Sequence, residues 1–129
     1  MRPGDGFTDE QRARLARSVA DTERATGLRV LLHVGRLEGG RAGAEALLTG
    51  CGDDAPSSIV VAVDPAARLL EIVTGALAAA VLADRTCGLA ALAMTSSFSA
   101  GDLVGGIRNG LQVLADHGAN ARTMHLDTF

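Results

Sequence analysis

Residues 58–75, SIVVAVDPAARLLEIVTG, decide the fold of this chain. Within this stretch, Ile59–Val63 is an unbroken apolar run rich in β-branched residues, which is typical of a strand buried on both faces. Asp64 and Pro65 then open a turn, because proline fixes φ near the value that a turn requires. A second β-rich run, Arg68–Thr74, ends at Gly75. The pattern predicts a β-hairpin over about residues 59–74, with its first strand in the centre of a sheet.

The other segments predict one more strand and helices on both faces of the sheet. Residues 8–26 show a helical pattern, with Thr8 as N-cap and Gln11 completing a capping box. Residues 28–34 alternate between apolar and more polar side chains, which predicts a strand. A short helix over 41–49, a mostly helical stretch over 75–95 and a last helix over 100–117 follow. We therefore predict an α/β sandwich on a small mixed sheet, in which 28–34 and 59–63 pair in parallel.

Glycines and capping residues predict where the later helices begin and end. Gly88 is expected to break the 75–95 stretch into two pieces. Ser99 is the expected N-cap of the last helix, with Asp102 at its third position and Gly118 as its C-cap. The glycines of that helix fit close packing better than ligand binding. The expected organisation is a flexible start over 1–6, one domain over 7–118, and a tail over 119–129 that adds an edge strand or lies disordered.

Composition restricts the class of protein. The chain has 129 residues, of which 47% are hydrophobic, with no Trp or Tyr, so we expect one domain with an aliphatic core. A net charge of −3 argues against nucleic-acid binding, which needs a basic face. We expect a cytoplasmic protein without a membrane span, because no long apolar run and no signal-peptide core are present. Cys51 and Cys87 are expected to be free thiols, with a disulfide between them as the alternative.

Three aspartates are the best candidates for chemistry, since the chain has no phosphate-loop, dinucleotide, zinc-protease or serine-hydrolase motif. Asp64 ends the buried strand, Asp84 interrupts an apolar helical stretch, and Asp102 lies at a helix start. A hard cation such as Ca²⁺ or Mg²⁺ takes several oxygen ligands, so Asp84 would hold one together with Asp64 or Asp102 if the fold brings them close. The alternatives are helix capping for Asp102 and an exposed or ion-paired acid for Asp84. A charge at Asp84 within an apolar helix would need a partner. Arg85 points away from Asp84 on a helix and is a separate candidate binding residue.

Several segments together resemble the TPM domain family. In order along Phe7–Gly118 they are FTDEQ, TGLRVLLHVG, SSIVVAVDPAARLLEIVTG, VLADR and SSFSAGDLVGGI. Their order and spacing resemble, more specifically, a short actinobacterial family of unknown function that is related to TPM. The resemblance implies a Rossmann-like α/β sandwich, and it implies the calcium binding and acid phosphatase activity that have been proposed for some TPM members.

The resemblance also carries over particular residues. Asp84 in the segment VLAD matches the acid of the family's V-L-T-D segment, and Gly75 matches the first Gly of its G-Y-G segment. Ala76, Leu77 and Ala83 stand where the family has the aromatic residue, the second Gly and the Thr. These departures remove polar and flexible groups near the site that the resemblance implies.

The sequence leads to three hypotheses about function. The first is a non-catalytic, TPM-like interaction or regulatory domain, whose partner is another protein or a second copy of the chain. The second is a weak metal-dependent phosphatase that uses Ca²⁺ or Mg²⁺. The third is a small-molecule binder at the cleft beside the strand ends, where α/β sheets commonly bind ligands. The distances between the carboxylates of Asp64, Asp84 and Asp102 discriminate between the second hypothesis and the others.

Overall fold

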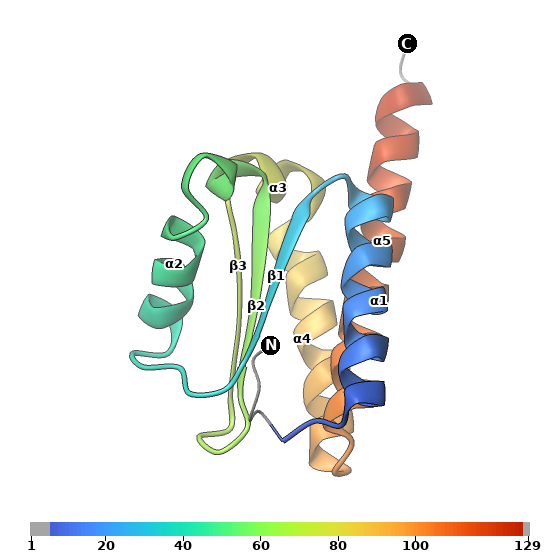
Figure 1. Ribbon diagram of the computed structural model, residues 1–129. Helices are drawn as coiled ribbons and strands as arrows, with labels where there is room; N and C mark the ends of the chain where they lie inside the picture. The colour runs from blue at the N-terminus through green and yellow to red at the C-terminus, as the bar shows by residue number, and fades with distance from the viewer. Residues whose placement is uncertain (1–5, 128–129) are drawn as a thin grey trace.

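The computed structural model of the protein describes residues 6–127, with side chains described through residue 120. The chain folds as helices packed around one small sheet (Figure 1). In order the elements are α1 (Asp9–Thr26), β1 (Arg29–Val34), α2 (Arg41–Thr49), the 3-10 helix η1 (Gly52–Ser57), β2 (Ser58–Asp64), β3 (Leu69–Thr74), α3 (Ala76–Val81), α4 (Asp84–Ser99) and α5 (Leu103–Asp127). The α/β class that the sequence predicts is confirmed.

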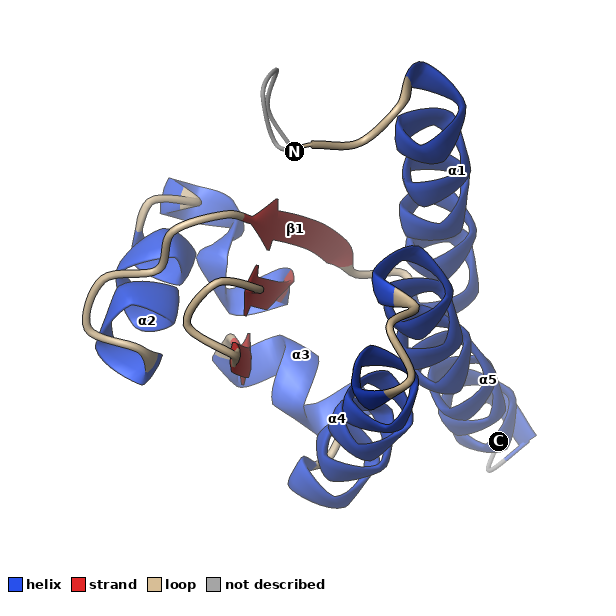
Figure 2. Cartoon of the chain, turned by 90° about the horizontal axis from the view of Figure 1, so that it is seen from below, coloured by secondary structure: helices blue, strands red, loops and turns tan. Residues whose placement is uncertain are grey.

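The sheet has three strands in the order β1-β2-β3. Strands β1 and β2 pair in parallel, with Val30 opposite Ile59, and β2 and β3 pair antiparallel, with Val61 opposite Ile72. Every residue of β2 is buried, as expected for a central strand covered on both faces. The predicted hairpin and the predicted parallel pairing are therefore both confirmed. Figure 2 shows the strands as a single row, with helices on either side.

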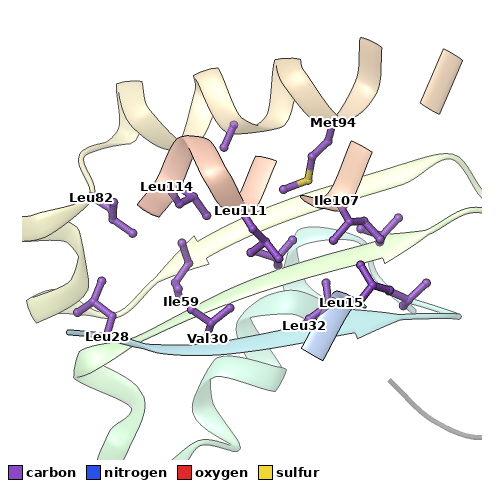
Figure 3. Packing of buried hydrophobic residues seen from close by; sticks show 14 of the residues in the cluster. Leu15, Leu28, Val30, Leu32, Ile59, Leu82, Met94, Ile107, Leu111 and Leu114 are labelled. Carbon is purple, nitrogen blue, oxygen red and sulfur yellow. The ribbon is translucent and has the colours of Figure 1, made fainter. Parts of the chain in front are cut away.

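Helices cover the two faces of the sheet unequally. Helices α1, α4 and α5 lie on one face, and α2 lies on the other (Figure 1). The larger core fills the space between the sheet and the three helices, where Ile59 and Val61 pack with Leu15, Met94, Ile107, Leu111 and Leu114 (Figure 3). The smaller core lies under α2, where Val60 and Ala62 pack with Leu37 and Ala44. The alternation along β2 thus divides its side chains between two aliphatic cores.

Glycines allow α5 to approach its neighbours closely. A Cβ atom on Gly106 would lie 2.6 Å from Cε1 of Phe98, and one on Gly110 would overlap the side chain of Met94. A Cβ atom on Gly118 would overlap Thr26 in α1. Gly106 and Gly110 therefore serve helix packing, as the sequence predicts, whereas Gly118, which the sequence predicts as a helix cap, packs against α1.

The predicted start of the last helix is wrong. Ser99 is the final residue of α4, and its hydroxyl donates a hydrogen bond to the carbonyl of Thr95 at 3.0 Å. Asp102 directly precedes α5 and acts as its cap, since its Oδ1 accepts a hydrogen bond from the N–H of Gly105 at 2.9 Å. Between them, Gly101 takes a left-handed φ of +87° that ends α4.

Two further boundary predictions are also wrong. The break in the 75–95 stretch lies at Leu82–Ala83, between α3 and α4, and Gly88 lies inside α4. Helix α5 does not end at Gly118 but continues to Asp127, because Gly118 faces α1 instead of forming a left-handed cap. The proposed tail is thus helical over 119–127. Residues 1–5 of the expected flexible start, and residues 128–129, lie outside the described residues.

Candidate functional site

A groove of about 510 Å³ lies beside the turn between β2 and β3. One wall is formed by the end of β2, the turn and the start of β3, and the other by the end of α4 and its connection to α5. The lining residues are Val63, Asp64, Pro65, Arg68, Leu69 and Leu70 on the first wall, and Thr95, Phe98, Ser99, Gly101 and Leu103 on the second. A more open hollow of about 570 Å³ adjoins the same turn and includes Gly35 and Arg36 after β1. The groove therefore lies at the carboxyl end of the central strand.

The turn beside the groove contains an unusual backbone conformation. Arg68 has a φ of +55° and is the one non-glycine residue with a positive φ in the described part of the chain. Its N–H donates to the carbonyl of Pro65 at 3.3 Å, which closes the turn before β3 begins. The left-handed conformation costs a residue with a side chain roughly 1 kcal/mol, and glycine or asparagine is favoured there. The backbone of Arg68 is therefore strained.

Asp64 uses its carboxylate to tie two segments together. Its Oδ2 accepts a hydrogen bond from the N–H of Leu37 at 3.0 Å, and its Oδ1 accepts one from the N–H of Ala67 at 3.2 Å. The residue is only 6% exposed. The Leu37 bond, followed by the Ala67 bond, lowers the pKa of the Asp64 carboxyl below its ordinary value, against the raising effect of its desolvation. Asp64 thus holds the segment after β1 against the hairpin turn.

The cation of the groove is the exposed guanidinium of Arg68. Among the described residues, no carboxylate forms an ion pair with Arg68 and no side chain hydrogen-bonds to its guanidinium. Arg36, beside the neighbouring hollow, is instead paired with Glu38 at 2.9 Å. The sequence patterns did not point to Arg68 as a site residue. One sequence feature could have identified it. The connection Pro65–Arg68 has four residues and ends in an arginine, at a position that favours glycine or asparagine.

The hydroxyl groups of the groove are engaged within their own helix. The hydroxyl of Thr95 donates to the carbonyl of Leu92 at 3.2 Å, and that of Ser99 donates to the carbonyl of Thr95. His33 and His117 bond to backbone carbonyls at 2.9 Å and do not line the groove. Through residue 120, where side chains are described, no hydroxyl or thiol bonds to a histidine that would activate it as a nucleophile.

The structure places Asp84 and Arg85 far from the groove. Asp84 is the first residue of α4, beside α3, and Figure 1 shows this junction at the opposite end of the sheet from the β2–β3 turn. Asp84 is exposed and lies in the first helical turn, where the helix dipole favours an acid. The expectation that it interrupts an apolar helix and needs a partner is therefore wrong. Arg85 is exposed beside it.

The three candidate aspartates do not form a cluster. Asp64 and Asp102 come to the same end of the sheet, but Asp64 is bonded to backbone amides and Asp102 caps α5. Within the described residues, no group of three or more His, Cys, Asp or Glu residues is arranged to hold a metal ion. Asp64, Asp84 and Asp102 therefore do not come together as a shared set of ligands for the expected Ca²⁺ or Mg²⁺ ion.

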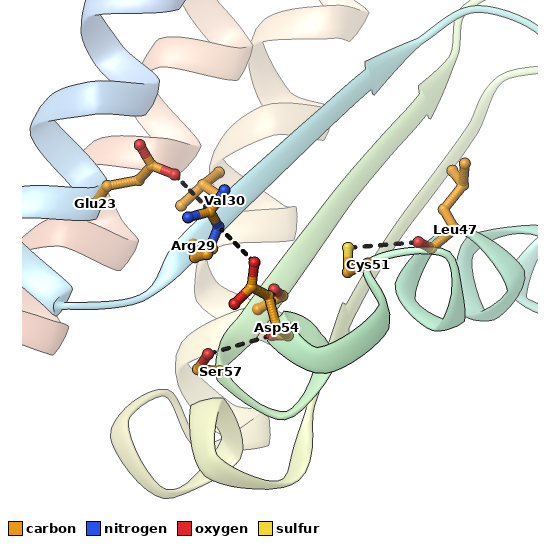
Figure 4. A network of polar contacts seen from close by, with 8 residues as sticks. Glu23, Arg29, Val30, Leu47, Cys51, Asp54 and Ser57 are labelled. Carbon is orange, nitrogen blue, oxygen red and sulfur yellow. Dashed lines mark hydrogen bonds and ion pairs between the residues drawn. The ribbon is translucent and has the colours of Figure 1, made fainter.

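A polar network at the other end of the sheet has a structural role (Figure 4). The Oε2 atom of Glu23 accepts a hydrogen bond from the N–H of Val30 at 2.9 Å, which satisfies an amide on the edge strand β1. Arg29 lies 3.5 Å from Asp54, and both side chains are largely exposed. These contacts join α1 and η1 to β1.

Both cysteines are free thiols, so the alternative of a Cys51–Cys87 disulfide is not realised. The thiol of Cys51 donates to the carbonyl of Leu47 at 3.5 Å (Figure 4). Burial raises the pKa of the Cys87 thiol above its ordinary value. A raised pKa leaves less thiolate at neutral pH, so Cys87 is suited to packing more than to nucleophilic attack.

Replacing Asp64 with Asn should lower the melting temperature at pH 7. An amide group can accept through its one oxygen, but its NH₂ group would face the N–H of Leu37 or of Ala67. Because the folded pKa of Asp64 is lowered, its stabilisation is present above the ordinary carboxyl pKa and is lost as the pH falls through the folded pKa. We therefore expect the difference in melting temperature between parent and Asp64→Asn to be large at pH 7 and to shrink in acid, below about pH 4.

The matched control is Asp53→Asn, which changes an exposed acid in η1. Thermal unfolding followed by circular dichroism at pH 7 and in acid compares the three proteins. A melting temperature of Asp64→Asn equal to that of Asp53→Asn at pH 7 would show that Asp64 does not hold the turn.

Comparison with known families corrects the resemblance inferred from the sequence. Residues 3–115 match the family model described as Domain of unknown function (DUF5130). The TPM resemblance is therefore wrong, and the residue matches that it implied for Gly75 and Asp84 have no support. No curated protein matches the chain.

A solved structure shares the fold. The NMR structure of the BA42 protein from the psychrophilic bacterium Bizionia argentinensis has a TM-score of 0.76 with this chain, at 14% sequence identity. The similarity covers 93% of this chain and 86% of that chain. At this identity the likeness establishes a common fold and nothing about activity.

None of the helices in the described residues combines the length and the apolar character needed to cross a membrane. The cytoplasmic location, the absence of nucleic-acid binding and a protein partner or self-association stay predictions from the sequence.

Proposed function

The chain belongs to the DUF5130 family, and on that premise we propose that it is a non-catalytic binding domain that holds a small ligand in the groove beside the β2–β3 turn. The observation that carries the proposal is the groove itself. Its volume of about 510 Å³ lies within the range of small-molecule sites, which is roughly 300–1,000 Å³. Most of its side chains are apolar, including Leu69, Leu70, Phe98 and Leu103, so it suits a ligand with an apolar body.

The place of the groove supports the same proposal. We propose that the domain is a Rossmann-like α/β sandwich. In such folds ligands bind outside the carboxyl ends of the parallel strands. Strands β1 and β2 are parallel, and the groove lies at the carboxyl end of β2. The α4–α5 connection forms the opposite wall, so the two walls come from segments far apart in the sequence.

The polar groups of the groove favour binding over hydrolysis. Phosphate-ester hydrolysis is very slow without a catalyst, so an enzyme must supply an activated nucleophile, a metal or well-placed donors. Asp64 is held by two backbone amides, and the hydroxyl protons of Thr95 and Ser99 are bonded within α4. No group of the groove is thus set up to attack an ester, and the phosphatase hypothesis finds no support there.

A neutral apolar fluorophore, N-phenyl-1-naphthylamine, tests the proposal by titration. Ser99→Phe places an aromatic ring in the groove, and Ser96→Phe is the matched control because Ser96 is exposed on the same helix and does not line the groove. We expect saturable binding to the parent and to Ser96→Phe, and at least about tenfold weaker binding to Ser99→Phe. No saturable binding to the parent, or equal binding to all three proteins, would reject the groove as the site.

An activity assay tests the non-catalytic part of the proposal. We expect no turnover of a chromogenic phosphate ester with or without Ca²⁺, Mg²⁺ or Mn²⁺. Asp84→Asn is the informative variant, because Asp84 is the acid that the sequence favours for a metal. Metal-stimulated turnover that Asp84→Asn abolishes, without a lower melting temperature, would replace this proposal with the phosphatase hypothesis.

A further inference from the structure

We propose that the ligand of the groove is a monocarboxylate with an apolar tail, and that Arg68 binds its carboxylate. This inference rests on the proposed function and adds the chemical class of the ligand. Three observations carry it: the strained backbone of Arg68, its unpaired guanidinium, and the mainly apolar walls beside it.

The strain is informative because the turn does not need an arginine. A left-handed residue at this point of a hairpin connection is favoured as glycine, which adopts that conformation without steric cost. Strained residues persist only where the surrounding structure holds them in place, and they cluster at active sites and ligand sites. Arg68 carries both features, because its φ is +55° and it lines the groove. The side chain of Arg68 thus gives a reason for the strain that the turn alone does not give.

The guanidinium of Arg68 is available to a ligand. The nearby carboxylate of Asp64 accepts hydrogen bonds from Leu37 and Ala67 and forms no ion pair with Arg68. A guanidinium presents donors in a planar fork that matches the two oxygens of a carboxylate. The carboxylate of Asp64 also lines the groove, but it is nearly buried and bonded to two amides, so the exposed charge is that of Arg68 and is complementary to an anion.

The number of available donors selects a monoanion over a phosphate. A phosphate group carries close to two negative charges at neutral pH and has three acceptor oxygens, so it calls for several donors. The hydroxyl protons of Thr95 and Ser99 are already donated within α4, which leaves Arg68 as the available side-chain donor among the described lining residues. The apolar side chains of Leu69, Phe98 and Leu103 then accommodate a hydrocarbon tail.

Competition between two probes of equal chain length tests the inference. The experiment measures how far octanoate and 1-octanol each displace N-phenyl-1-naphthylamine at pH 7, where octanoate is ionised. We expect octanoate to displace it from the parent at a concentration at least about tenfold lower than 1-octanol, because a hydrogen bond to a charged group contributes more than a neutral one. Arg68→Gly and Arg68→Asn should lose this preference and still bind the fluorophore.

The variants keep the test independent of folding. Glycine and asparagine both tolerate a positive φ, so Arg68→Gly and Arg68→Asn should melt no lower than the parent. Arg36→Ala is the matched control, since Arg36 adjoins the neighbouring hollow and should leave the preference intact. An equal displacement by octanoate and 1-octanol in the parent, or a preference that survives in Arg68→Gly, would overturn the inference while fluorophore binding still upheld the groove. Failure of the fluorophore to bind the parent would reject both proposals together.

Discussion

Val61→Asp is expected to prevent folding. Val61 is fully buried in the central strand β2, and its side chain lies in the larger core beneath helices α1, α4 and α5. An ionised carboxylate there would have no partner, and leaving a charge buried and unpaired costs several kcal/mol. That cost is comparable with the total stability of a domain, which is about 5–15 kcal/mol. Far-UV circular dichroism and thermal melting should show an unfolded or aggregated protein.

The matched control is Leu92→Asp, because Leu92 is 63% exposed on α4. The same change in side chain should there leave folding intact. A soluble Val61→Asp protein that melts cooperatively, at a temperature near that of Leu92→Asp, would contradict the assignment of β2 as the buried centre of the sheet.

Ile107→Ala should lower the free energy of unfolding by roughly 2–5 kcal/mol, the range for truncation of a large buried side chain. Ile107 is fully buried on α5 and packs in the larger core with Leu111 and Leu114. Close contacts of α5 with α4 at Gly106 and Gly110 limit how far the helix can collapse into the cavity. Urea unfolding monitored by circular dichroism measures the change.

Arg108→Ala is the control for Ile107→Ala, since Arg108 is the next residue and is exposed. Surface changes of this kind usually stay within about 0.5 kcal/mol. If the change in the free energy of unfolding for Ile107→Ala also stayed within that range, Ile107 would not lie on the buried face of α5.

Local patterns predicted the elements whose residues interact with their neighbours in sequence. The run Ile59–Val63 identified the central strand because both of its faces are covered by apolar side chains. Thr8 and Gln11 identified the start of α1, where the structure has both reciprocal hydrogen bonds of a capping box. These features are decided within a few residues of chain.

Boundaries that depend on tertiary packing were not predictable in the same way. Ser99 and Asp102 are both good capping residues, and only the left-handed Gly101 between them decides which one caps α5. In the sequence, Gly118 is typical of a helix end, but in the structure it lies against Thr26 within the helix. A glycine pattern alone does not distinguish a cap from a close approach of two helices.

The candidate site was predicted in its location at the strand ends and in one lining residue, Asp64, although for a cation and not for an organic ligand. Its walls come from the β2–β3 turn and the α4–α5 connection, which are separated by some thirty residues, so no local pattern contains them. Asp84 was predicted as a site residue because it is a charge in an apolar stretch of sequence. In the structure it is exposed and lies in the first turn of α4. Arg68 was not predicted as a site residue because it is distinguished by its positive φ angle, and the identity of a side chain does not reveal the φ angle of its backbone.

The most direct test of the binding groove is a titration of ¹⁵N-labelled protein with octanoate, followed by amide chemical shifts. We expect the largest shifts at residues 64–70 and 98–103, on the two walls of the groove, with saturation at one site. At the same octanoate concentration, those chemical-shift changes should be smaller in Ser99→Phe than in the parent and unchanged in Ser96→Phe. Shifts centred instead on the exposed face of α4 around Leu89 and Leu92, or no saturable shift at all, would contradict the groove as the site of ligand binding.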